Sequence, residues 1–395
     1  MGSVALASLA QASIPTDTPT DAPTPTTPPT TTEVLAESWS AYRQRFIQAD
    51  GRVIDWEQGG RTVSEGQAYA MLRAVFVDDP ATFAQTLQWA ENNLRRVSES
   101  GQPADSLWAW KWGQTPQGSW EILDRNFASD ADLDAATALI LASRRWNRSD
   151  YLDLARTKLK DLWELSTIMA SSGAASSGQP KRYFLPGPVV AFQPQPPVAY
   201  LNPSYLAPYA FRLFAQVDSE RDWLSLVESS YDVLEQSTQV SAVKLPSDWI
   251  AINLTTGQYQ PPPIRSQLHS TYSFDAYRVW WRIALDAAWF NEPRAKTFLQ
   301  DHLSHLQTLW QTRQAIPARI SLRGVATVRY EATSQYAMLY PAFQLTQPEI
   351  AEEIWQQKLL PTYQNGIWDN DSAYYVQNLA WFGLFPPSRM QEWLN

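Results

Sequence analysis

The sequence predicts an all-α protein, and three observations lead to this fold class. Apolar residues recur at three- and four-residue steps in about a dozen segments, which is the period of a helix with one buried face. No convincing alternation of strands with helices appears along the chain. Hydrophobic residues make up 44% of the sequence, which is ample for a buried core.

The predicted helices are separated by long loops at 98–129, 167–201 and 238–273. Functional sites commonly lie on long loops that a rigid frame holds in place, so we expect these loops to line an open cleft. The part at 171–201, rich in Ser and Gly and then in Pro, is expected to be a mobile surface excursion. The helices are expected near 37–48, 64–76, 80–97, 130–146, 149–166, 202–216, 219–237, 274–290, 294–312, 329–344, 347–359 and 370–384.

The first 33 residues are predicted to lie outside the helical domain. Residues 1–12 are small and apolar, and they end on an Ala-Gln-Ala triplet typical of a signal-peptide cleavage site. We interpret 1–12 as a signal-peptide remnant, which predicts a secreted or periplasmic protein; an ordinary chain end is the alternative. Residues 13–33 are rich in Thr and Pro and predict a disordered linker. Residues 34–395 are then a single domain.

Acidic residues open two of the predicted helices. Glu65 follows Ser64, the expected N-cap, at a position where the helix dipole favours negative charge. Gly66 beside it leaves room for a ligand, although Glu65 could also serve only the helix end. The segment 128–146 opens on a second expected cap followed by three acids, more than capping requires: Ser129, Asp130, Asp132 and Asp134.

Together these two stretches resemble glycoside hydrolase family 8. That family contains bacterial endo-β-1,4-glucanases, including the cellulase of cellulose-synthesis systems, and also chitosanases, lichenases and xylanases. The segment from Ala128 to Trp146 fits the family signature except at Ala135, where the pattern has Ile or Met. The resemblance covers most of the chain after residue 37. It implies an (α/α)6 barrel, Glu65 as general acid, and sugar binding by Asp130 and Asp132.

A third stretch supplies the second carboxyl group. Asp275 and Arg278 lie three residues apart, and on spacing alone they predict an ion pair on one helix. In the resemblance, Asp275 matches the general base of the cellulase subgroup and Arg278 holds it ionised, while Phe274 replaces a common Tyr. An inverting enzyme places an acid and a base roughly 6.5–9.5 Å apart. Glu65 must then stay protonated, which burial or a nearby acid would favour.

Aromatic residues are candidates for stacking on sugar rings. The chain has 19 Trp and 17 Tyr, for each of which core packing is the alternative role. Three Trp lie within 108–112 and cannot all pack inward, so Trp110 or Trp112 is expected to stack on a sugar. The resemblance adds Tyr205 to the sugar site. Tyr374, in the last predicted helix, is also expected to bind substrate.

Composition excludes several other classes of function. The net charge is −9 and no basic run appears, which argues against nucleic acid and favours a neutral substrate. Cysteine is absent, so thiolate chemistry and disulfides are excluded. No phosphate-binding loop, serine-hydrolase elbow or metal-ligand set is visible, so we expect no metal, no cofactor and no stable membrane insertion.

The sequence therefore predicts an inverting endo-β-1,4-glucanase that acts as a monomer on β-1,4-glucan. Cellulose-synthesis machinery is a candidate partner through the resemblance alone. Chitosanase, lichenase and xylanase activities are the alternatives within the family. A catalytically inactive, glycan-binding toroid is the alternative outside enzymes, but it would be expected to have lost one of the two carboxyl groups.

Overall fold

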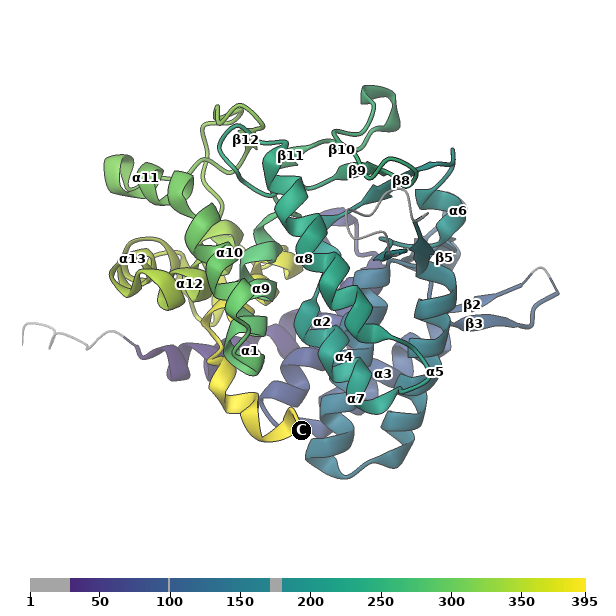
Figure 1. Cartoon of the computed structure of the whole chain (residues 1–395). Coiled ribbons are helices and arrows are strands. Elements are labelled where there is room, and N and C mark those ends of the chain that lie inside the picture. Colours follow the sequence, from purple (N-terminus) through teal and green to yellow (C-terminus); the bar gives the residue numbers. More distant parts are fainter. Residues whose placement is uncertain (1–28, 99, 171–179) are drawn as a thin grey trace, which may run out of the picture.

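Six helices form a closed inner ring. In the computed structural model, which describes residues 29–98, 100–170 and 180–395, each of these helices packs against the next and the last returns to the first (Figure 1). In order around the ring they are α2 (Ser64–Phe76), α4 (Ser129–Trp146), α7 (Pro208–Val217), α9 (Tyr277–Phe290), α12 (Thr333–Thr346) and α14 (Tyr374–Leu384).

Six further helices cover the inner ring from outside. Each packs against an inner helix, in the pairs α3 with α2, α5 with α4, α8 with α7, α10 with α9, α13 with α12 and α1 with α14. The prediction of an (α/α)6 barrel is therefore confirmed. The outer helices are α1 (Thr31–Phe46), α3 (Pro80–Asn93), α5 (Ser149–Ser166), α8 (Trp223–Gln239), α10 (Pro293–His302) and α13 (Pro348–Ile354); two more, α6 (Val189–Phe192) and α11 (Ser304–Arg313), lie outside this scheme.

Close packing holds the inner ring together. The buried apolar side chains form one continuous cluster that runs from Val34 to Leu394. At Gly383 in α14, an added Cβ would lie 2.0 Å from the carbonyl oxygen of Ala337 in α12. Any larger residue at position 383 would therefore push these two neighbouring inner helices apart.

Short strands occupy the connections, and sequence periodicity did not predict them because each strand described is only two to six residues long. Two sheets have three strands, in the orders β1-β4-β5 and β10-β9-β8, and the others are two-stranded. The strands are β1 (Thr62–Val63), β2 (Arg95–Val97), β3 (Pro103–Trp108), β4 (Lys111–Gln114), β5 (Trp120–Asp124), β6 (Thr167–Met169), β7 (Arg182–Phe184), β8 (Val198–Leu201), β9 (Ile250–Asn253), β10 (Tyr259–Gln260), β11 (Thr271–Tyr272), β12 (Ile320–Ser321), β13 (Tyr363–Gln364) and β14 (Ile367–Trp368).

Several predicted boundaries need correction. Helix α1 begins at Thr31, where Thr30 and Glu33 form a reciprocal capping box, so the predicted linker 13–33 extends too far. Residues 1–28, which include the predicted signal-peptide remnant, lie outside the described residues. Residues 171–179 also lie outside them, but the rest of the predicted mobile excursion contains β7, α6 and β8, two of them paired with other strands.

Among the described residues, no helix is both long and apolar enough to cross a membrane.

Candidate active site

The N-terminal ends of the inner helices gather the predicted catalytic residues at one end of the barrel. Glu65 is the second residue of α2, Asp130 the second residue of α4, and Tyr374 the first residue of α14. Asp275 precedes α9 by two residues, and Arg278 lies in the first turn of that helix. Helix N-termini carry partial positive charge, so this end of the ring favours a cluster of carboxylates.

Arg278 joins the three acids. Its Nη1 atom lies 2.6 Å from Glu65 Oε2 and 3.0 Å from Asp130 Oδ2, and its Nη2 atom lies 2.9 Å from Asp275 Oδ1. The guanidinium is buried, and it also donates to the hydroxyl groups of Tyr69 and Ser204. One positive charge therefore faces three acids, which favours at least one of them holding a proton.

Glu65 is held by two donors and screened from solvent. Besides Arg278, the Tyr374 hydroxyl donates to Glu65 Oε1 over 2.9 Å. Burial raises the pKa of Glu65; Arg278 and Tyr374 oppose that shift, and the negative charge of Asp275 adds to it. Burial thus raises the pKa of Glu65 by more than the helix dipole lowers it, as the sequence led us to expect. Gly66 lies close to the Tyr374 ring, 3.5 Å from where a Cβ would be, and its predicted room for a ligand stays a prediction.

Asp275 is the most accessible of the three acids. Its side chain is 35% exposed, against 18% for Glu65 and 2% for Asp130. Asn202 Nδ2 donates to its second oxygen over 3.2 Å. The loop before α9 is fixed by Asp248, which accepts hydrogen bonds from Ser273 and from the amide of Ala276. Asp275 can therefore reach solvent while its backbone stays in place.

Asp130 is buried between Glu65 and the buried ion pair that Asp134 forms with Arg282. Burial is the main reason that the pKa of Asp130 is raised to about 7, against the attraction of Arg278. Behind it, Arg282 binds both oxygens of Asp134 over 2.9 Å. Asp130 thus belongs to the catalytic cluster, whereas Asp134 is neutralised by its own arginine.

The structure does not bring Asp132 into the cluster, which corrects its predicted role in sugar binding. Its side chain is fully buried and forms an ion pair of 3.2 Å with Lys158 Nζ from α5. Both carboxylate oxygens also accept from the backbone N–H of Trp108. Alternate residues in the first turn of a helix point in different directions, so Asp132 fastens α4 to α5 and to the end of β3.

The predicted aromatic residues are half-buried near the acids. The carbonyl of Trp110 accepts from the N–H of Ser64, directly before Glu65. Trp112, on β4, stacks on Trp120 with ring centroids 5.0 Å apart. Tyr205 packs against the catalytic arginine, whose Cζ lies 5.3 Å from the ring centroid.

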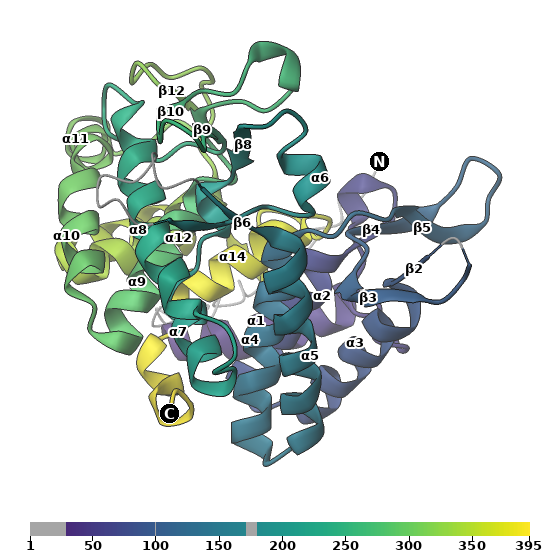
Figure 2. The same ribbon diagram turned by 45° about the vertical axis from the view of Figure 1, so that its right-hand side comes forward.

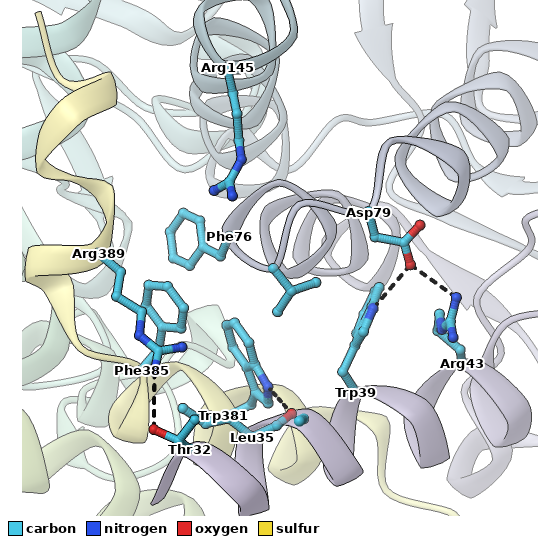
Figure 3. Close-up of a pocket in the computed structure, with 12 residues that line it drawn as sticks. Thr32, Leu35, Trp39, Arg43, Phe76, Asp79, Arg145, Trp381, Phe385 and Arg389 are labelled. Carbon is cyan, nitrogen blue, oxygen red and sulfur yellow. Dashed lines mark hydrogen bonds and ion pairs between the residues drawn. The ribbon is translucent and has the colours of Figure 1, made fainter.

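A large cavity elsewhere is not the active site. It measures about 630 Å³ and lies between α1 and the C-terminal ends of α2 and α14, at the far end of α2 from Glu65 (Figure 3). Asp79 is the acid in the lining of this cavity. It accepts hydrogen bonds from the side chains of Trp39 and Arg43, as the dashed lines in Figure 3 show. The cavity therefore offers no second carboxyl group for hydrolytic chemistry.

Several residues of the site escaped the sequence analysis. Tyr69 lies four residues after Glu65 on α2, so helical spacing could have placed it on the same face. Asn202, Ser204 and Asp248 come from segments distant in sequence, and the sequence analysis gave these three side chains no role in the site. Among the described residues, no group of three His, Cys, Asp or Glu has the arrangement of a metal site.

The chain matches one protein family and several known proteins. A sequence model of the family described as "Glycosyl hydrolases family 8" matches residues 28–384. A protein of Xanthomonas axonopodis pv. citri (strain 306) named "Endoglucanase" is 33% identical over 299 residues, which cover 73% of this chain and 70% of that protein.

Two further relatives have the same kind of name. The "Endoglucanase" of Escherichia coli (strain K12) is 29% identical over 249 residues, covering 63% of this chain and 62% of that protein. The crystal structure of "endo-1,4-D-glucanase" from Vibrio fischeri ES114 aligns with a TM-score of 0.72 at 26% identity, covering 88% of this chain and 93% of that one. The aligned part spans less than two thirds of the Escherichia coli protein.

Proposed function

The chain belongs to the glycosyl hydrolases family 8, and we propose that it is an inverting endo-β-1,4-glucanase. The observation that carries this proposal is the buried guanidinium of Arg278, which binds two differently exposed acids, Glu65 and Asp275. Hydrolysis of a glycosidic bond needs one protonated and one ionised carboxyl group. The names of the aligned relatives support a β-1,4-glucan as the substrate.

Glu65 is the proposed general acid. Its raised pKa keeps a proton available for the leaving glycosidic oxygen. The Tyr374 hydroxyl holds Oε1, so the carboxyl plane is fixed before substrate arrives. When Glu65 gives up its proton, the new negative charge lies beside Arg278, which stabilises it.

Asp275 is the proposed general base. It is the most exposed acid of the cluster, so a water molecule can reach it, and Arg278 and Asn202 each donate to one of its two oxygens. It would take a proton from that water as the water attacks the anomeric carbon on the face opposite the leaving group. Retaining chemistry would instead need a carboxylate that attacks the carbon directly.

Sugar binding is assigned to the residues around this pair. Asp130 would accept a hydrogen bond from a hydroxyl of the sugar at the cleavage point, alongside Arg278. Trp110, Tyr205 and Tyr374 offer aromatic surface near the acids, and Trp112 offers it farther along β4. We expect the long loops to line a cleft that is open at both ends, which would let a polymer enter along its length and be cut internally.

Location and partners are proposals of the same kind. The Ala-Gln-Ala triplet near the start of the chain supports secretion or a periplasmic location. The family resemblance supports cellulose-synthesis machinery as a partner, and we propose a monomer. Light scattering on the eluted peak of a size-exclusion column would test the oligomeric state.

The proposed substrate is tested on a panel of polymers. Reducing ends should appear, and viscosity should fall steeply, with carboxymethylcellulose, while chitosan and xylan give little product. Proton NMR should show the α-anomer first if the β-linkage is inverted. A faster reaction on mixed-linkage glucan, xylan or chitosan would replace the glucanase assignment by that activity, and no hydrolysis of any polymer would leave the inactive toroid.

A further inference from the structure

Trp120 is the most exposed tryptophan of the described residues, and the proposed catalytic reaction does not use it. It lies at the start of β5, and 45% of its surface is open to solvent. Figure 2 shows the β4–β5 hairpin projecting from the barrel beside the β2–β3 hairpin. An exposed tryptophan leaves a large apolar surface in water, so its position on a projecting arm suggests a ligand.

The Trp120 ring is held rigidly. Directly opposite residues of paired strands share a face, so the pairs Gln114–Trp120 and Trp112–Ile122 place both tryptophans on one face of the hairpin. The two rings stack at 22° with centroids 5.0 Å apart. Arg52 braces them, with its Cζ 4.6 Å and 4.5 Å from the Trp112 and Trp120 centroids.

The Arg52 side chain is held in place by hydrogen bonds, and it forms no ion pair with a carboxylate among the described residues. Its Nε donates to Thr62 Oγ1 over 2.9 Å, and another nitrogen donates to the Gly60 carbonyl. In the part of the chain that the structure describes, Trp112 and Arg52 make the aromatic and cation–π contacts of Trp120, and 45% of the surface of Trp120 stays open to solvent.

The hairpin is continuous with the catalytic cluster. Strand β4 pairs with β1, and Thr62 of β1 lies opposite Trp112 and three residues before Glu65. The carbonyl of Trp110 binds the N–H of Ser64. The hairpin is therefore joined directly to the segment that carries Glu65, and we expect a polymer that lies across the acids to extend to it.

We propose that Trp120, backed by Trp112 and Arg52, is an outlying β-glucan-binding platform that holds a distant part of the polymer while the acids act on another. This inference rests on the proposed function for its ligand. A flat ring stacks on the apolar face of a glucosyl unit, and the fixed ring loses little conformational freedom on binding. The platform contributes to the affinity for long chains and leaves the chemical step unchanged.

The binding test uses a protein that cannot cut its ligand. Affinity electrophoresis in gels that contain hydroxyethylcellulose is run with Glu65→Gln as the parent and with Trp120→Ala, Trp120→Thr or Trp120→Phe added. Loss of the ring should weaken binding by about fivefold or more, which is close to 1 kcal/mol. Trp120→Phe should keep most of the affinity. Leu123→Ala is the matched control, since Leu123 is 38% exposed on the opposite face of the same strand.

Kinetics of the active enzyme separates this inference from the proposed function. Trp120→Ala and Trp120→Thr should raise KM for carboxymethylcellulose and leave kcat on a nitrophenyl cello-oligosaccharide unchanged, with unchanged melting temperatures. If either folded variant binds and cuts the polymer like its parent, the platform does not exist. If the wild-type enzyme cuts no β-glucan of any length, the proposed function fails and the platform loses its ligand.

Discussion

Arg278 Nη1 lies 2.6 Å from Glu65 Oε2, although the two residues are 213 positions apart in the chain. Sequence spacing assigned this arginine to Asp275 alone, yet it binds both carboxyl groups and Asp130 as well. Protonation of Glu65 and of Asp130 is therefore linked, because negative charge on one raises the proton affinity of the other.

Removing either proposed catalytic carboxyl should abolish most polymer hydrolysis. Glu65→Gln keeps the shape of the side chain but has no acidic proton, and Asp275→Asn cannot accept one from water. General acid or base assistance is worth about 10²–10⁴-fold, so each variant should lose at least about a hundredfold in kcat on carboxymethylcellulose. Initial rates of reducing-end release measure this loss.

The leaving group distinguishes the two roles. A nitrophenolate departs with little protonation, so Glu65→Gln should recover much of its rate on a nitrophenyl cello-oligosaccharide. Asp275→Asn should stay slow on both substrates, because its defect lies at the water. An Asp275→Asn enzyme that keeps wild-type activity would move the base elsewhere, and full activity of Glu65→Gln on polymer would restrict Glu65 to the helix end.

Local sequence patterns predicted where the helices lie better than they predicted which residues cap them. The expected helix at 64–76 has those bounds, but the capping roles of Ser64 and Ser129 are wrong. Ser64 Oγ is buried and has no hydrogen-bond partner among the described residues, and the Ser129 hydroxyl donates to the Leu185 carbonyl. A tertiary acceptor 56 residues away competes with the local cap, and no local pattern reveals it.

The same limit applies to the site. Motifs identified Glu65 and Asp275 because each opens a helix of the inner ring within a recognisable stretch. The partner of Asp132 could not be found in this way. Lys158 lies on another helix, α5, and the sequence does not distinguish it from the other charged residues of that helix. Ring closure, which brings the N-terminal ends of α2, α4 and α9 together at one end of the barrel, decides which acids share Arg278.

Tyr374→Phe should shift the pH dependence of catalysis. The Tyr374 hydroxyl donates to Glu65 and lowers the pKa of that acid, so its removal should raise the pKa further. The alkaline limb of kcat/KM should then move upward by as much as about one pH unit. Tyr375→Phe is the control, because the Tyr375 hydroxyl donates to the Phe274 carbonyl instead. Equal pH profiles for Tyr374→Phe and wild type would contradict the proposed role of this hydrogen bond.

Arg278→Met should destabilise the fold in a pH-dependent way. Removing one partner of a buried ion pair costs about 3–5 kcal/mol when the charge left behind stays ionised. The acids around position 278 can escape that cost by taking up protons, so the loss should be larger at pH 8 than at pH 5. Urea unfolding at the two pH values measures the difference. Arg294→Met, on the surface, should show no such pH dependence. If Arg278→Met loses the same stability at both pH values, lost packing and not the unpaired charge accounts for the destabilisation.

Asp130→Asn should stabilise the protein selectively at high pH. The pKa of Asp130 in the folded state is raised to about 7 from an ordinary value of 3.8, chiefly by burial. The folded state therefore binds this proton more tightly than the unfolded state does. The resulting contribution to stability is fully present below the unfolded value of 3.8, and it is lost as the pH rises through about 7.

Asn is neutral at every pH and resembles the protonated acid in shape. The melting temperature of Asp130→Asn relative to wild type should thus rise between pH 5 and pH 8.5, by at least about 1 °C, as wild-type Asp130 is forced to ionise. Asp150→Asn should show no such gain, because hydrogen bonds from Arg148 lower the pKa of Asp150. If Asp130→Asn instead loses the same stability at both pH values, Asp130 is ionised throughout, and its bond to Arg278 outweighs the cost of burial.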